Sequence, residues 1–166
     1  MAVIAMKPEN SSIHSRPVGT IFSDLEGLQM LTVETRQAID PKTAKTFDTD
    51  ALRANFHVGT MFQPGEIRLC YSHYDRMIVG GAVPDGASLV LDEVRECGTK
   101  SILDRREMVV VCVEGDGSVA AGGETHDMAK GDMLYLPMGS GPVTFAKNAK
   151  FYILSAPAHT AHPRRH

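Results

Sequence analysis

The sequence contains no tryptophan and only three cysteines, Cys70, Cys97 and Cys112. This count is odd and the sequence has no CxxC pair, so disulfide bonds are not expected. Two of the cysteines lie inside apolar runs, where a free cysteine usually behaves as a small buried hydrophobic residue. We therefore expect free thiols, which the reducing cytoplasm maintains.

Long apolar runs and an excess of basic charge are also lacking. No run approaches the roughly 18 residues that a membrane span needs, and the opening MAVIAM is too short for the core of a signal peptide. The formal net charge of -3 gives no basic field for nucleic acid or anionic lipid. These absences predict a cytoplasmic protein with neither nucleic acid nor a membrane as partner.

Three common catalytic motifs are missing as well. The sequence contains no phosphate-binding loop followed by Lys-Ser/Thr, no GxSxG elbow and no HExxH pair. Nucleophilic catalysis and nucleotide binding are therefore not predicted.

What the sequence does have is a series of short apolar runs separated by turns. With 15 glycines and 9 prolines in 166 residues, turn residues are frequent. About nine runs from Gly65 onward have the length and composition of strands. Two of them, MVVVCV and FYILSA, are apolar on both faces and rich in β-branched residues, as expected for strands between two layers. This pattern predicts an all-β sandwich or small barrel.

The first part of the chain differs from this pattern. Residues 1–29 lack a sustained apolar period and are predicted to be an irregular N-terminal extension. Pro41 marks a turn, and Asp48 offers an N-cap for a short helical turn. We expect one domain over residues 30–163, with residues 164–166 as the start of a linker or tail.

The stretch GDMLYLPMGSGPVTF, residues 131–145, has the spacing of the second signature hairpin of the cupin barrels. Where that hairpin places a metal-binding histidine, this chain has Pro142. The first cupin motif should place His-x-His before Glu107, yet neither possible spacing finds a histidine: the positions hold Lys100 and Ile102, or Ser101 and Leu103. Three imidazoles and a carboxylate make such a site, so this barrel is predicted to hold no metal.

Two polar clusters are candidate sites. His73, Asp75 and Arg76 alternate with apolar neighbours and are predicted to lie on a strand, where they either line a pocket or form a buried hydrogen-bonded ion pair. Asp104-Arg105-Arg106-Glu107 enters the most apolar strand, where an unpaired charge costs several kcal/mol. We therefore expect Arg105 or Arg106 to pair with Glu107, a neighbouring carboxylate or a carboxylated ligand.

Five blocks of the sequence, in order, resemble the N-terminal half of the bacterial 5-keto-4-deoxyuronate isomerases, which are tandem cupins of the pectin pathway. The blocks are AKTFDTDALRANF, YSHYDRMIVGGAVP, LDRREM, GDMLYLPMGSGPVTFA and AKFYILSAPAHT. The resemblance implies a zinc ion in the second cupin, downstream of this chain, and a homo-oligomer that is a hexamer in the family. The residues of this chain that match the pattern of the family's N-terminal half are Tyr71, His73, Asp75, Arg76, Arg105, Arg106, Glu107 and His159.

Three interpretations follow. The first is the metal-free N-terminal cupin of a ketol-isomerase that interconverts 5-dehydro-4-deoxy-D-glucuronate and 3-deoxy-D-glycero-2,5-hexodiulosonate, by resemblance. The second is a stand-alone cupin that binds a small carboxylated sugar without catalysis, with Arg76 or Arg106 holding the carboxylate. The third is a divergent metalloenzyme that uses His57, His73 and the histidines of the C-terminal tail.

Overall fold

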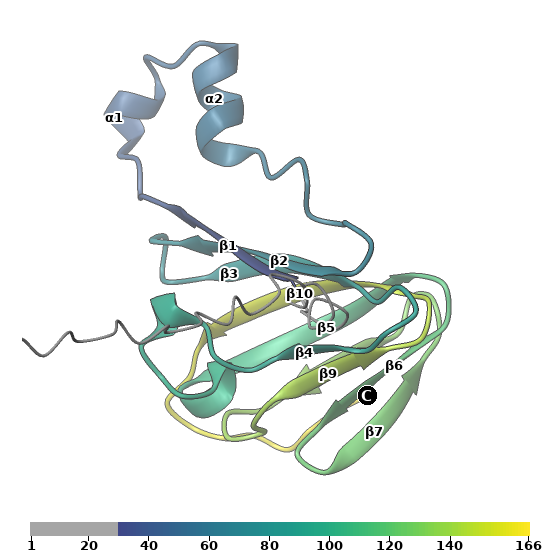
Figure 1. Cartoon of the computed structure of the whole chain (residues 1–166). Coiled ribbons are helices and arrows are strands. Elements are labelled where there is room, and N and C mark those ends of the chain that lie inside the picture. Colours follow the sequence, from purple (N-terminus) through teal and green to yellow (C-terminus); the bar gives the residue numbers. More distant parts are fainter. Residues whose placement is uncertain (1–29) are drawn as a thin grey trace, which may run out of the picture.

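The structure, a computed structural model, describes residues 30–166, so the extension predicted over residues 1–29 lies outside the described residues. Two sheets pack face to face (Figure 1). The six-stranded sheet has the order β1-β2-β3-β10-β5-β8, and the four-stranded sheet has the order β4-β9-β6-β7. The strands are β1 (Met30–Arg36), β2 (Glu66–Ser72), β3 (Ile78–Val83), β4 (Leu89–Leu91), β5 (Arg106–Glu114), β6 (Gly117–Ala121), β7 (Glu124–Met128), β8 (Met133–Leu136), β9 (Val143–Ala146) and β10 (Lys150–Pro157).

The strands from β3 to β10 pair in a nested order. β3 pairs with β10, β4 with β9, β5 with β8 and β6 with β7, all antiparallel. This nesting over two sheets is a jelly roll, the double-sheet architecture of the cupins. The nine runs expected from Gly65 onward correspond to β2–β10, so the all-β cupin prediction is confirmed.

The core lies between the two sheets and follows from the alternation of side chains along each strand. In β5, Met108, Val110 and Cys112 are buried in the core, whereas Val109 and Val111 are half-buried on the outer face. The largest fully buried side chains include Phe145 and Phe151, whose rings lie 5.4 Å apart, centroid to centroid. The described chain therefore has one continuous apolar core.

The region before β2 contains one strand and one helix that the sequence patterns did not predict. β1 pairs in parallel with β2, and its residues 31, 33 and 35 take the core-facing register of that strand. Between them lie two helices, α1 (Pro41–Ala44) and α2 (Thr49–Phe56). The helix expected after Asp48 is confirmed as α2, and the Asp48 carboxylate accepts a hydrogen bond from Ala51 N at 2.8 Å.

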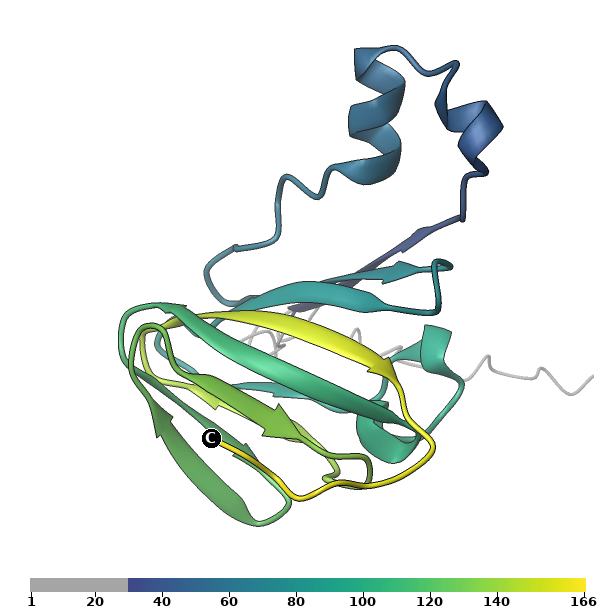
Figure 2. The same cartoon turned by 180° about the vertical axis from the view of Figure 1, so that it is seen from behind.

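Both helices stand away from the sandwich, on the side of the six-stranded sheet that faces away from the four-stranded sheet (Figures 1 and 2). Pro41, where a turn was expected, begins α1, because the Asp40 side chain caps this short helix and proline fits its first turn. Neither helix contains a buried residue, and Leu52 and Phe56 of α2 remain 43% and 47% exposed. Neither helix of residues 30–166 is long and apolar enough to cross a membrane.

Two 3-10 turns, η1 (Arg95–Cys97) and η2 (Ile102–Asp104), connect β4 to β5. After β10 the tail returns to the free edges of β8 and β7. Tyr135 N donates to Arg165 O at 2.8 Å on β8, and Arg164 Nη1 lies 2.9 Å from the Glu124 carboxylate on β7. The tail therefore joins the two sheets at their open side.

Candidate functional site

Most of the polar residues singled out in the sequence meet at one end of the six-stranded sheet. The turn between β2 and β3 carries His73, Asp75 and Arg76, while β5 begins at Arg106 opposite Pro157, the last residue of β10. Ala158 N donates to Arg105 O at 3.0 Å, which places the exposed His159 at the same end. We call this end of the sandwich the arginine end.

Arg106 is the central side chain of the arginine end. It is only 5% exposed, and its guanidinium donates to neutral oxygens alone: Ser155 Oγ at 3.1 Å, Ser155 O at 3.0 Å and Arg76 O at 2.6 Å. Burial lowers the pKa of Arg106, but an arginine keeps its proton in proteins. A positive charge is therefore buried here without a carboxylate partner among the described residues.

The predicted pairing of Arg105 or Arg106 with Glu107 or another protein carboxylate is wrong. Arg106 and Glu107 are neighbours on β5, so their side chains point to opposite faces of the sheet. Glu107 instead accepts a hydrogen bond from Tyr135 Oη at 2.8 Å on the outer face. Burial and this hydrogen bond raise the pKa of Tyr135, because only the neutral phenol can donate to the carboxylate, which would repel a phenolate. Only the carboxylated-ligand alternative remains for Arg106.

The prediction that His73, Asp75 and Arg76 lie on a strand, with a buried ion pair as one alternative, is also wrong. All three are exposed in the turn after β2, and the structure shows no ion pair between them. Asp75 and Arg76 have φ angles of 50° and 54°, and Met77 N donates to Tyr74 O at 3.1 Å, as in a type I′ turn. Such φ angles disfavour residues with a Cβ, so the bond from Arg106 to Arg76 O helps to hold a strained turn.

Tyr71, Cys97 and Ser155 are further residues of the arginine end. The Tyr71 ring meets the His73 ring edge-on, with centroids 5.5 Å apart. Burial is the largest cause of the lowered pKa of Arg106, which also responds to Cys97, Tyr71 and Arg76. Sequence reasoning missed Cys97 and Ser155. Ser155 had a signal: it follows Phe151 and Ile153 at the core-facing spacing of β10, where a polar residue needs a hydrogen-bond partner.

The interior of the sandwich does not fit a zinc ion. Met108, not Glu107, is the residue at the start of β5 that faces the core, and Ile102 and Leu103 are fully buried where histidines would be needed. Pro142 is exposed. Within residues 30–166 no group of three His, Cys, Asp or Glu side chains is placed to hold a metal. We derive no catalytic step through a metal in this chain.

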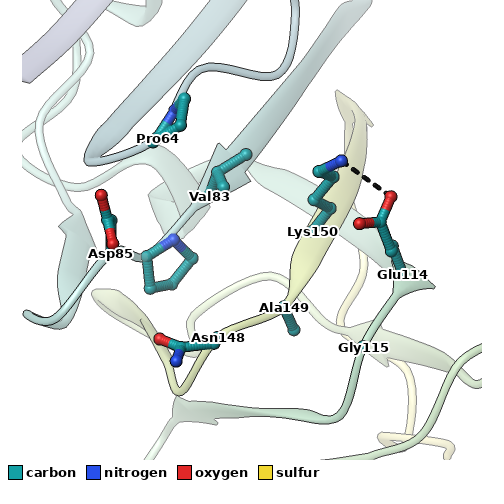
Figure 3. A pocket seen from close by; sticks show the side chains of 9 residues that line it. Pro64, Val83, Asp85, Glu114, Gly115, Asn148, Ala149 and Lys150 are labelled. Carbon is teal, nitrogen blue, oxygen red and sulfur yellow. Dashed lines mark hydrogen bonds and ion pairs between the residues drawn. The ribbon is translucent and has the colours of Figure 1, made fainter.

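The structure has one hollow far from the arginine end and another that adjoins it at Glu107. A pocket of about 230 Å³ opens at the far end of β5, with Asp85 on one side and the ion pair of Glu114 and Lys150, at 2.7 Å, on the other (Figure 3). A hollow of about 410 Å³ lies between the tail and the outer sheet face, and is lined by Glu107, Tyr135, His162, Pro163 and Arg165. Of the candidate residues, Glu107 and the tail histidine His162 line the second hollow.

Comparison with known proteins connects the chain to one enzyme family. No family model matches it. Proteins named 4-deoxy-L-threo-5-hexosulose-uronate ketol-isomerase are similar in sequence, with 65% identity over 136 residues in Cereibacter sphaeroides and 55% over 136 residues in Agrobacterium fabrum. Each match covers 82% of this chain but only 50% of the relative, so the chain spans about half the length of these proteins.

Two solved structures are also similar. A cupin protein from Bacteroides fragilis has a TM-score of 0.39 and 17% identity over 52% of this chain and 70% of that chain. An RmlC-like cupin protein from Desulfovibrio desulfuricans has a TM-score of 0.41 and 18% identity over 56% of this chain and 82% of that chain. The nested strand order itself identifies the jelly roll. In sequence, the chain is therefore homologous to one half of the proteins named 4-deoxy-L-threo-5-hexosulose-uronate ketol-isomerase.

Proposed function

We propose that this chain is the N-terminal half of a ketol-isomerase that interconverts 5-dehydro-4-deoxy-D-glucuronate and 3-deoxy-D-glycero-2,5-hexodiulosonate. The observation that carries the proposal is the 65% identity over 136 residues to proteins named for this chemistry. The three free thiols, two of them buried, fit the reducing cytoplasm as its location.

Within this proposal the described half acts as a folding and assembly unit. Its interior is filled by apolar side chains, and a ketol-isomerase needs a base that moves a proton between adjacent carbons and a group that stabilises the enediol charge. A zinc ion supplies such stabilisation when bound, and we assign it to the other half of the family's polypeptide. The expected oligomer, a hexamer in the family, is part of the same proposal.

The test compares the 166-residue chain alone, the complementary half of the Cereibacter sphaeroides relative alone, and the two mixed. We expect neither isomerase turnover nor stoichiometric zinc from this chain alone, and turnover from the mixture. Turnover by this chain alone, lost in His73→Ala or His57→Ala, would contradict the proposal and favour a divergent metalloenzyme.

A second candidate function has its own observation. Arg106 is a buried cation with only neutral oxygen partners, and Arg76 lies beside it on the strained turn. A planar guanidinium suits a carboxylate, so the arginine end is a candidate site for a small carboxylated sugar that is bound without being converted.

Calorimetric titration distinguishes carboxylate binding at the arginine end from a purely structural role of Arg106. The ligands are D-galacturonate and, as the neutral control, D-galactose, and the proteins are the wild type, Arg76→Gln and Lys147→Ala. Carboxylate recognition predicts binding of the uronate alone, weakened by Arg76→Gln and not by Lys147→Ala. Equal heats from both sugars would leave Arg106 as a structural residue.

A further inference from the structure

The outer face of the six-stranded sheet carries a continuous apolar surface on its last three strands. Met133 of β8, Val111 of β5 and Tyr152 of β10 lie side by side in register. One step along, Tyr135, Val109 and Leu154 form a second row. We name the valine face by its apolar members, which are Val109, Val111, Val113, Met133, Tyr152 and Leu154.

This surface is accessible and separate from the core. Met133 is 62% exposed and Val113 is 36% exposed, while the other four members are half-buried. None of the six belongs to the core cluster between the sheets. Glu107 stands at one end of this surface and the Lys150–Glu114 pair at the other, while the tail residue Arg165 lies at the β8 edge, where its carbonyl accepts from Tyr135 N.

When one face of a sheet meets water, each strand usually alternates polar with apolar residues, whereas a strand that is apolar on both faces is typical of a sheet covered on both sides. β5 is of the second kind, yet among the described residues a layer covers only its inner face. Next to the valine face, the segment that returns from α2 already covers the outer face of β3. Met61 O lies 2.6 Å from where a Cβ on Gly81 would be, too close for any other residue. Gly81 pairs with Tyr152 of β10, so this segment covers the strand next to the valine face.

We propose that the valine face is the surface on which the complementary half of the ketol-isomerase polypeptide docks, sheet against sheet. This inference rests on the proposed function. The occupant of the valine face is inferred from the length of the relatives. They are about twice as long as the matched segment, so a second unit of similar size is present to pack against this half. Twisted sheets pack about 10 Å apart with nearly aligned strands, and an apolar face three strands wide provides such a contact.

The experiment mixes the 166-residue chain with the complementary half of the Cereibacter sphaeroides relative and measures the dissociation constant by sedimentation velocity. We expect a one-to-one complex, weakened about 100-fold or more by Val111→Glu, because the new carboxylate is buried without a partner. Thr144→Glu is the matched control, since Thr144 occupies the outer face of β9 in the other sheet, and it leaves the affinity unchanged. Met133→Lys is the second variant, because a lysine at this exposed position leaves folding intact.

Methionine oxidation by peroxide locates the contact without a mutation. Met133 and Met30 are 62% and 52% exposed, but Met30 lies on β1, at the opposite edge of the sheet. We expect the complex to protect Met133 and leave Met30 reactive.

The other outcomes overturn the inference in distinguishable ways. A complex that restores turnover but is insensitive to Val111→Glu and leaves Met133 reactive would preserve the proposed function and reject the valine face as its docking surface. A homodimer of this chain that protects Met133 and dissociates with Met133→Lys would make a second copy the occupant. Protection of Met133 in the chain alone, lost on deletion of residues 1–29, would make that segment the occupant. Absence of both complex and turnover would reject the proposed function itself.

Discussion

The outer faces of the two sheets cover the same core from opposite sides, yet they differ in chemistry. On the four-stranded sheet, Ala120, Thr144 and Thr125 lie side by side in register, and Ser118 and Asp127 are neighbours in the next row. These side chains are small or polar, although Val90 of β4, which pairs with Thr144, adds one exposed apolar side chain to the first row. The corresponding rows of the six-stranded sheet contain valine, leucine, tyrosine and methionine. One sheet of this sandwich is therefore suited to be its surface, and the other to lie inside a larger assembly.

The largest expected effect separates the two faces of a single strand. Val110 is fully buried, and Val110→Asp should cost about 4 kcal/mol or more, enough to unfold a marginally stable domain. Val111→Asp lies on the valine face and should change the free energy of unfolding of the isolated chain by about 1 kcal/mol or less. Urea denaturation checks both values, and equal losses would show that the valine face is already covered within this chain.

The next effect uses another pair of neighbours on β5. Arg106→Ala removes three hydrogen bonds at the arginine end and should cost about 3 kcal/mol. Glu107→Ala loses only the bond from Tyr135 and should cost about 1 kcal/mol. Lys147→Ala, at an exposed turn, should cost about 0.5 kcal/mol or less. Denaturation midpoints rank the three variants, and equal midpoints for Arg106→Ala and Glu107→Ala would restore the idea that these residues act as a pair.

A smaller effect concerns pH. Because the pKa of Tyr135 is raised in the folded chain, its neutral phenol contributes stability that is fully present below the unfolded pKa, near 10, and is lost as pH rises from there through the higher folded pKa. We expect the wild type to lose more stability than Tyr135→Phe as the pH rises above about 10. Thermal melting across this range checks the difference, with Tyr152→Phe as the control on the same face. If the melting temperatures of wild type and Tyr135→Phe fall in parallel with rising pH, the hydrogen bond to Glu107 does not cause the loss of stability.

The smallest expected effect is a gain. Arg76→Gly relieves an unfavourable φ angle while keeping the carbonyl that Arg106 binds, and should raise the free energy of unfolding by about 0.5 kcal/mol. A rise in melting temperature supports this reading. A fall would mean that the exposed Arg76 side chain itself stabilises the arginine end.

The strand pattern of the sandwich was predictable because strands β2–β10 alternate, or are apolar throughout, between explicit turn residues. β1 was missed because MLTVETR has few large apolar residues and its pairing partner, β2, lies some thirty residues away along the chain. The site was harder to predict. Sequence identified Arg106 and Glu107 but not that strand alternation separates them, nor that Ser155 of β10 accepts a hydrogen bond from Arg106. Such contacts depend on tertiary packing, which no local pattern records.

The nested strand order has a consequence for how the chain folds during synthesis. The strand made last, β10, lies in the middle of the six-stranded sheet, between β3 and β5. Until that strand leaves the ribosome, the β6–β7 hairpin can form, but β3 and β5 have no common neighbour and the apolar core stays open. Pairings between strands that are distant in the sequence form slowly, and until they form the unpaired strand edges are exposed and prone to aggregation. Deletion of β10 should therefore prevent the whole sandwich from folding. Chaperones that recognise exposed apolar surface would bind this chain late in translation.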